Sequence, residues 1–204
     1  IMSAPYEPMV GRYLRLTLGG LACRVYVEEA GQGIPLICLH TAGADGRQYR
    51  HLLTDHEVTD RFRVIVFDMP WHGKSSPPEG WQDTDYQLTT AAYLEMVLAL
   101  ADALALEQPV VMGCSIGGRA VLHLARLHGA RLGAVIGLQS SAMVEPYYDT
   151  SWLHRGDVHG GEVSAAQVSG LIAPDAPSAE RWETLWHYMQ AVSYTHLTLP
   201  TNRE

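Results

Sequence analysis

The sequence has few of the features that mark a disulfide-rich or metal-binding protein. Among its 204 residues there are only three cysteines, which are widely spaced and form no CxxC pair. An odd number of isolated cysteines is not expected to build a disulfide framework or a zinc site. We interpret them as buried thiols of a reducing compartment and expect no bound metal. They are Cys23, Cys38 and Cys114.

Positive charge and long apolar runs are also scarce. The 14 Lys and Arg residues face 22 Asp and Glu residues, and the net charge of −8 argues against a broad nucleic-acid surface. No apolar run approaches the roughly 18 residues of a membrane span, and residues 1–20 lack the basic and apolar regions of a signal peptide. We therefore predict a cytoplasmic protein that binds a small molecule, with no nucleic-acid or membrane partner. The oligomeric state stays open.

The residues that are present suffice for a folded core, because 47% are apolar and 18% are charged. Residues 13–18 and 23–27 alternate apolar and polar positions around Gly19-Gly20, which predicts a hairpin. Continuous apolar runs predict strands buried on both faces at residues 35–39, 62–67, 109–112 and 132–138. Helices are predicted between them at residues 47–53, 89–104 and 120–128. This alternation predicts an α/β fold with a mostly parallel sheet covered by helices on both faces.

The pattern changes after residue 139. Two helices are predicted at residues 163–172 and 179–190 with no further strand, so we expect a core in residues 1–144 and a partial helical cap in residues 145–191. Residues 192–201, VSYTHLTLPT, resemble the translation of a transposase sequencing adapter. We interpret residues 192–204 as non-native read-through at the end of a DNA fragment.

The motif that carries chemistry is Gly113-Cys114-Ser115-Ile116-Gly117, which matches G-x-S-x-G directly after a predicted strand and before a helix. On such a strained turn the serine hydroxyl stands above the sheet, and glycines two residues away leave room for the backbone. The pattern predicts Ser115 as a nucleophile supported by Gly113 and Gly117, with Cys114 pointing away. The alternative is a glycine-rich turn of purely structural use.

Acyl transfer also needs two backbone N–H donors for the oxyanion. One is expected from Ile116, the residue after the nucleophile, at the start of a helix whose N-terminus favours negative charge. The other is expected from the loop His40-Thr41-Ala42-Gly43, which follows the strand at residues 35–39. The alternative for this loop is a plain strand-to-helix connection.

Together these segments resemble the α/β-hydrolase superfamily over about residues 13–139. Residues 68–75 are similar to the Asp-x-x-Gly-x-Gly-x-Ser loop of its esterases, enol-lactonases and meta-cleavage hydrolases, but Trp71 stands where glycine is usual. Thr41 likewise replaces the usual glycine of the oxyanion loop. The resemblance implies Ala42 as the second donor. Ser115 in place of a carboxylate argues against epoxide hydrolase and haloalkane dehalogenase chemistry.

The resemblance also implies a chain order of serine, acid and histidine. The strands that precede the acid and the histidine are missing, so both partners are expected beyond Ala191, and the chain as written is expected to be inactive. Open alternatives are His72 as base and Glu145 as acid. Asp68 is expected to hold its loop together.

We therefore predict a serine hydrolase that acts through an acyl-enzyme on a small, largely apolar ester, lactone or related carbonyl substrate. The candidate substrate pocket comprises His40, Thr41 and Trp152. No cofactor is expected, because residues 113–118 lack the Lys-Ser/Thr of a phosphate-binding loop. The alternative function is a receptor on the same scaffold that binds a ligand without turnover.

Overall fold

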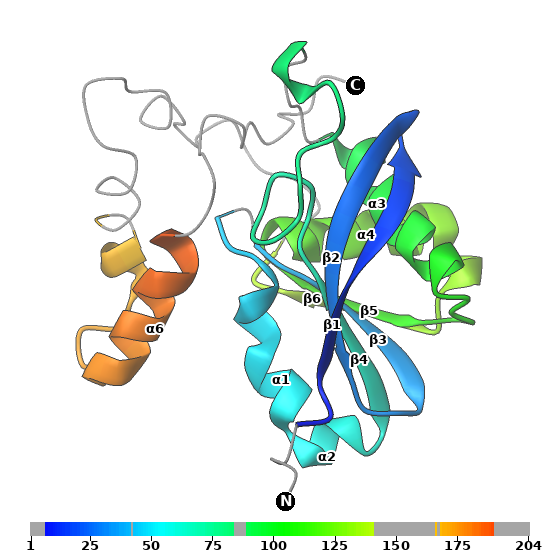
Figure 1. Ribbon diagram of the computed structural model, residues 1–204. Helices are drawn as coiled ribbons and strands as arrows, with labels where there is room; N and C mark the ends of the chain where they lie inside the picture. Colours follow the sequence, from blue (N-terminus) through cyan, green and yellow to red (C-terminus); the bar gives the residue numbers. More distant parts are fainter. Residues whose placement is uncertain (1–6, 42, 84–88, 141–165, 167, 190–204) are drawn as a thin grey trace, which may run out of the picture.

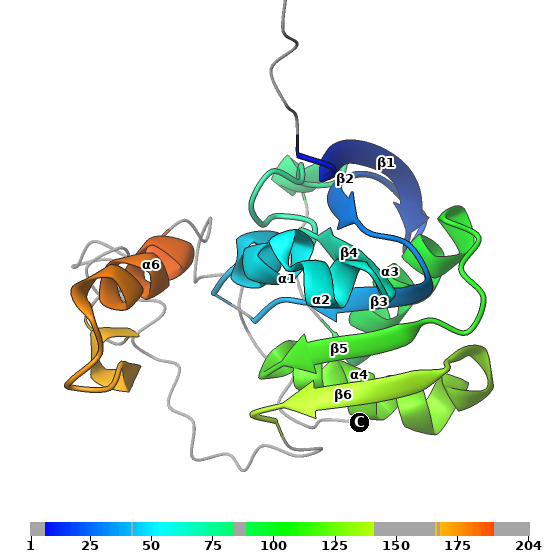
Figure 2. The ribbon, with the colours of Figure 1, turned by 90° about the horizontal axis from the view of Figure 1, so that it is seen from below.

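A computed structural model describes residues 7–41, 43–83, 89–140, 166 and 168–189. Six strands form one sheet in the order β1-β2-β4-β3-β5-β6, which Figure 2 shows from one end. The first two strands form the predicted antiparallel hairpin, β2 is antiparallel to β4, and the remaining pairs are parallel. The strands are β1 (Val10–Leu18), β2 (Leu21–Ala30), β3 (Ile34–Leu39), β4 (Phe62–Phe67), β5 (Val110–Cys114) and β6 (Ala134–Leu138).

Helices cover both faces of this sheet, as predicted (Figures 1 and 2). Side chains of a strand alternate between faces, so each central strand supplies two separate cores. On β3, Ile37 and Leu39 pack with α3 (Thr90–Ala103) and α4 (Ile116–His128), whereas Leu36 and Cys38 pack with Leu53 of α1 (Arg50–Thr54). The central strands are buried on both faces, which explains their continuous apolar runs.

The long helix α3 follows the local rules closely. The side chain of Thr89 accepts a hydrogen bond from the Ala92 N–H at 3.1 Å and so caps the first turn. Apolar residues at helical spacing form the buried side of the helix. Among the residues buried on this side are Tyr93, Met96, Val97, Leu100 and Ala101.

The short helices differ from their predicted bounds. The helix predicted at residues 120–128 begins earlier, at Ile116, directly after the serine turn. The helix predicted at residues 47–53 divides into a 3₁₀ turn, η1 (Gly46–Tyr49), and α1. The four-residue α2 (His56–Thr59) was not predicted, because so short a helix offers no periodicity to detect. Two further 3₁₀ turns are η2 (Trp81–Asp83) and η3 (Gly129–Arg131).

The second helix predicted in the cap is α6 (Ser178–Met189), one residue from its predicted bounds at each end. Figure 1 shows α6 on the side of the molecule where α1 lies. Of the helix predicted at residues 163–172, residue 166 and residues 168–171 are helical, and residues 163–165 and 167 lie outside the described residues. Residues 141–162 and the tail from residue 190 also lie outside them. No helix within the described ranges is both long and apolar enough to cross a membrane.

Candidate active site

Ser115 occupies a strained turn between β5 and α4. Its backbone has φ 55° and ψ −113°, a conformation that residues with a side chain rarely adopt. The Ser115 N–H donates to the Leu138 carbonyl at 2.9 Å, and the Ser115 carbonyl accepts from the Arg119 N–H at 2.9 Å. The turn is therefore fixed on one side by β6 and on the other by the first turn of α4. Ser115 itself is exposed.

Close approach of the backbone explains the two glycines around this serine. A Cβ atom at Gly117 would lie 2.5 Å from the Leu39 carbonyl oxygen, and one at Gly113 would lie 2.3 Å from the Gly117 carbonyl carbon. Any side chain at either position would push α4 away from β3 or from β5. The glycines let the helix begin immediately after the serine.

Of the two predicted oxyanion donors, Ile116 lies within the described residues and Ala42 does not. Ile116 is the first residue of α4, and the first four N–H groups of a helix have no acceptor within the helix. Its N–H is therefore of the kind that can bind an anion. Ala42 and Trp152 lie outside the described residues, as does Glu145.

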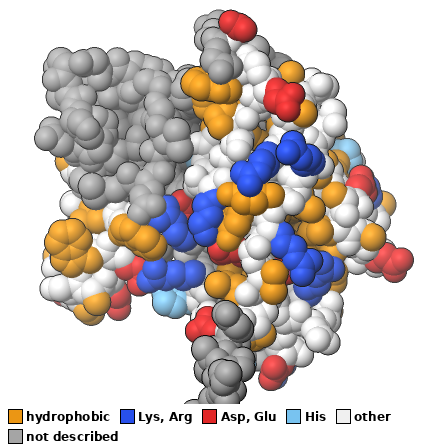
Figure 3. All heavy atoms as spheres, viewed as in Figure 1, with side chains coloured by type: hydrophobic (Ala, Val, Ile, Leu, Met, Phe, Trp, Pro, Cys, Tyr) orange, Lys and Arg blue, Asp and Glu red, His pale blue; other side chains and the backbone are white. Residues whose placement is uncertain are grey.

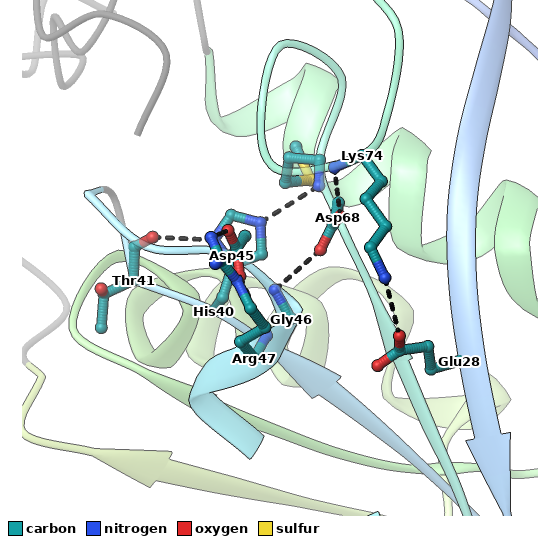
Figure 4. Close-up of polar contacts among 9 residues, drawn as sticks. Glu28, His40, Thr41, Asp45, Gly46, Arg47, Asp68 and Lys74 are labelled. Atoms are coloured by element: carbon teal, nitrogen blue, oxygen red, sulfur yellow. Dashed lines mark hydrogen bonds and ion pairs between the residues drawn. The ribbon is translucent and has the colours of Figure 1, made fainter. Parts of the chain in front are cut away.

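His40 connects the loop after β3 to the loop after β4 (Figure 4). Its Nε2 accepts from the Met69 N–H at 3.1 Å, so Nδ1 carries the proton and donates to the Thr41 carbonyl at 2.8 Å. Burial lowers the pKa of His40, which keeps the ring neutral. Both ring nitrogens are engaged within the protein, which favours a supporting role over contact with substrate.

Thr41 is buried, and its N–H donates to Oε1 of Gln48 at 2.9 Å. Gln48 lies on η1 and was not among the predicted site residues. The bond joins residues seven apart in the sequence across a loop, and no local spacing pattern indicates such a contact.

Asp68, at the end of β4, organises the loop that follows it (Figure 4). Its Oδ1 accepts from the Gly46 N–H at 2.8 Å and its Oδ2 accepts from the Lys74 N–H at 2.7 Å. The Ser75 hydroxyl donates to the Asp68 carbonyl at 2.6 Å and accepts from the Tyr26 N–H at 2.8 Å. The expectation that Asp68 holds its loop together agrees with this geometry. Burial raises the pKa of Asp68 to about 6, against the effect of the two N–H donors.

The same loop contains the residue that departs from the family pattern. Trp71 adopts φ 72°, a left-handed conformation that glycine adopts without strain. Its buried ring packs edge-on against Trp81 with centroids 5.3 Å apart. His72 is buried beside it, and its ring centroid lies 5.0 Å from that of His40. These contacts place His72 in the packing of the loop.

The described cap helix is attached to the core near this site. Arg50 Nη2 and His51 Nε2 of α1 lie 2.8 and 2.9 Å from Oε1 of Glu183 on α6. One turn further along α6, the Trp186 ring lies 4.5 Å from the guanidinium carbon of Arg47. Arg47 also forms an ion pair with the buried Asp45, whose side chain caps η1. The turn that carries Gln48 therefore also contacts the cap.

The described part of the chain holds no group of three or more His, Cys, Asp or Glu residues arranged to bind a metal ion. A mostly parallel sheet in which a serine occupies a strained strand-to-helix turn is typical of one class of α/β proteins. Residues 34–155 match the sequence profile of the α/β hydrolase fold, and the chain belongs to this family.

Individual relatives agree with this assignment. The chain is similar to 2-hydroxymuconate semialdehyde hydrolase of Pseudomonas sp. (strain CF600), with 29% identity over 71% of this chain and 49% of the relative. It is also similar to pimeloyl-(acyl-carrier protein) methyl ester esterase of Aeromonas hydrophila, with 34% identity over 57% of this chain and 42% of the relative. The chain thus spans about half the length of these curated relatives or less.

Solved structures show the same fold. The enol-lactonase from Burkholderia xenovorans LB400 superposes with a TM-score of 0.72 and 18% identity, covering 90% of this chain and 68% of that one. A thermophilic esterase from Thermogutta terrifontis superposes with a TM-score of 0.71 and 19% identity, covering 91% of this chain and 71% of the esterase.

Proposed function

We propose that this chain is the part of a serine hydrolase that carries the nucleophile and the oxyanion hole. The observation that carries the proposal is the conformation of Ser115, which is exposed at φ 55° between β5 and the first N–H groups of α4. Backbone strain of this kind persists only where the surrounding structure enforces it, and it concentrates at functional sites. A purely structural turn gains nothing from an exposed, strained serine.

In the proposed reaction, the Ser115 Oγ attacks the substrate carbonyl carbon while its proton passes to a general base. The carbonyl oxygen becomes an oxyanion held by the N–H groups of Ile116 and Ala42. Collapse of this intermediate breaks the bond to the leaving group, which takes the proton from the base. Water then attacks the acyl-enzyme by the same route and releases the acid. We place the base and its orienting carboxylate in the full-length protein, outside the described residues.

The substrate is proposed to be a small, largely apolar ester, lactone or related carbonyl compound. Two relatives support the carbonyl chemistry by their names, one a methyl ester esterase and the other a hydrolase of a hydroxymuconate semialdehyde. Both act on compounds that present a carbonyl group for attack. A serine nucleophile is suited to all of these substrates.

A fluorophosphonate probe tests this proposal on the full-length protein. The probe phosphonylates an activated serine with loss of fluoride, so we expect labelling at Ser115, identified by mass spectrometry of the modified peptide. The Ser115→Ala variant should lose both the label and the hydrolysis of a p-nitrophenyl ester, while retaining its melting temperature. A folded full-length protein that hydrolyses no ester and takes up no label at Ser115 would contradict the proposal and favour a ligand receptor.

A further inference from the structure

The backbone at the end of β3 is bound by side chains at three successive carbonyl groups. The Tyr49 hydroxyl donates to the Leu39 carbonyl at 2.8 Å. The Tyr93 hydroxyl donates to the His40 carbonyl at 3.2 Å, and Nδ1 of His40 donates to the Thr41 carbonyl at 2.8 Å. A buried carbonyl group needs a hydrogen-bond partner, and beyond the end of a strand the sheet no longer supplies one. Here the side chains supply it.

The two tyrosines approach this segment from opposite faces of the sheet. Tyr49 lies on η1 and packs in the core that contains Leu36 and Cys38 of β3. Tyr93 lies on α3 and packs in the core on the other face, which contains Ile37. Both side chains are buried, and burial raises the pKa of Tyr49, so its hydroxyl keeps its proton and acts as a donor. A shift of the segment towards one face would break the hydrogen bond that is made from the other.

The peptide group between His40 and Thr41 is held at both of its polar ends. Its carbonyl accepts the Tyr93 hydroxyl, and its N–H donates to Oε1 of Gln48 at 2.9 Å. A peptide group is planar, so a hydrogen bond at each end fixes its orientation. Tyr93 lies on α3 and Gln48 on η1, so two separate elements determine how this peptide is turned.

The segment held in this way lies against the nucleophile turn. Leu39 is paired with Gly113, two residues before Ser115, in the parallel ladder between β3 and β5. A Cβ atom at Gly117, in the first turn of α4, would lie 2.5 Å from the Leu39 carbonyl oxygen. This oxygen is therefore close to the start of α4, where the first N–H groups of the helix are proposed to bind the oxyanion. A carbonyl oxygen is partly negative, so one that turned towards the oxyanion would oppose its stabilisation.

We propose that Tyr49 and Tyr93 are positioning residues of the candidate active site, which hold the carbonyl groups at the end of β3 in a fixed orientation beside the Ser115 turn. This inference rests on the proposed serine hydrolase function and is independent of the identity of the base. Each tyrosine acts through the backbone carbonyl that its hydroxyl binds. The negative charge that these carbonyls could disturb exists in the transition state, so the effect falls on kcat, and binding of the uncharged substrate is little affected.

The test replaces each tyrosine by phenylalanine in the full-length protein and measures hydrolysis of a p-nitrophenyl ester. Phenylalanine keeps the buried ring and removes only the hydroxyl that binds the carbonyl. Tyr49→Phe and Tyr93→Phe should each lower kcat by about 5- to 50-fold, because misoriented carbonyls disturb the site where the oxyanion forms. KM should stay within about threefold, since ground-state binding is unaffected. Tyr13→Phe is the matched control, because Tyr13 is 42% exposed on β1 and its variant should keep the kcat of the wild type.

A second measurement separates positioning from a general loss of stability. An alkyl trifluoromethyl ketone forms a tetrahedral adduct with the serine and so places an oxyanion in the site. Its affinity should fall by the same factor as kcat, whereas a change that only lowers the melting temperature leaves the affinity of the folded protein unchanged. The two tyrosines lie in separate cores, so each variant tests the proposal on its own, also where the other does not fold.

The outcomes for the tyrosines and for the proposed function can be told apart. Folded phenylalanine variants with kcat within twofold of the wild type, or with an unchanged affinity for the ketone, would overturn the role of the tyrosines alone. In that case the wild type still hydrolyses the ester and takes up the fluorophosphonate label at Ser115. A folded wild type that does neither would overturn the proposed function and this inference with it.

Discussion

Asp68 is a buried carboxylate, and its surroundings change its pKa in opposite directions. Burial raises its pKa, while the N–H groups of Lys74 and Gly46 favour the ionised form and lower it. The nearby carboxylates of Asp45 and Glu28 raise the pKa further. Burial is the larger effect, and the pKa rises from the usual 3.8 to about 6. Between about pH 4 and pH 6, Asp68 is therefore protonated in the native state and ionised in the unfolded state.

Because of this pKa shift, we expect Asp68 to make the free energy of unfolding depend on pH. Below about pH 4 the contribution of Asp68 is fully present, and it is lost as the pH rises through the folded-state pKa of about 6. The unfolding free energy of the wild type minus that of Asp68→Asn should fall by up to about 3 kcal/mol between pH 4 and pH 7. Urea denaturation at a series of pH values measures this difference. A flat difference over this range would show that the two N–H donors cancel the effect of burial, and a rising difference would show that they outweigh it.

At the residue scale, the strained turn at Ser115 could be predicted from the sequence, whereas the contacts of the neighbouring loops could not. Ser115 could be predicted because its turn needs glycines at fixed local positions, and Gly113 and Gly117 provide that pattern. The contact of Gln48 with the Thr41 N–H could not be predicted, because it depends on how the chain folds back between β3 and η1. The left-handed backbone of Trp71 was indicated only by the family pattern, which has glycine there.

At the scale of elements, strands were predicted more accurately than helix ends. The run at residues 62–67 coincides with β4, because a strand buried on both faces must be apolar throughout. The start of α4 was missed because Gly117 and Gly118 disfavour helix in isolation. In the folded protein their lack of side chains is what permits a helix so close to β3 and β6. Tertiary packing overrides the local propensity at this point.

The attachment of α6 to α1 predicts a measurable coupling between two charges. Arg50 Nη2 lies 2.8 Å from Glu183 Oε1, and the two side chains are 38% and 28% exposed. A partly exposed pair of this kind contributes about 0.3–1 kcal/mol at low salt. It contributes less at 1 M salt, where the Debye length falls to about 3 Å. We expect a double-mutant cycle with Arg50→Gln and Glu183→Gln, followed by urea denaturation, to give this coupling energy and its loss at high salt.

The matched control for this cycle is Glu180→Gln, which removes the same charge from the first turn of the same helix. Glu180 has no ion pair with Arg50 among the described contacts, so its coupling to Arg50→Gln should be near zero. Equal coupling for Glu180 and Glu183, or coupling that salt does not change, would contradict a direct ion pair between α1 and α6.

At the scale of the whole molecule, basic side chains are visible on one face although the net charge is negative. The net charge is −8, yet the face in Figure 3 displays Lys and Arg side chains among apolar and acidic ones. Along the hairpin and its neighbours, Arg12 and Arg63 pair with Glu29, and Lys74 pairs with Glu28. Such pairs contribute little to stability where they are exposed.

The opposite edge of the sheet determines how the chain should behave in solution. Within the described residues β6 pairs with β5 alone, and its side chains Ile136 and Leu138 are 41% and 40% exposed. A strand edge with exposed apolar side chains is a template for pairing with another chain. We therefore expect the 204-residue chain to self-associate, which sedimentation velocity at several concentrations would detect.

Ile136→Lys should shift the chain towards monomer, because a lysine on an edge strand would have to bury its charge when two edges pair. Leu171→Lys is the matched control. Leu171 is 77% exposed, and a lysine at this position adds the same charge outside the sheet. If the edge of β6 drives association, the lysine at position 136 reduces the sedimentation coefficient far more than the lysine at position 171. Equal effects would assign the association to general hydrophobicity, and a wild-type chain that stays monomeric at every concentration would show that the β6 edge is protected in solution.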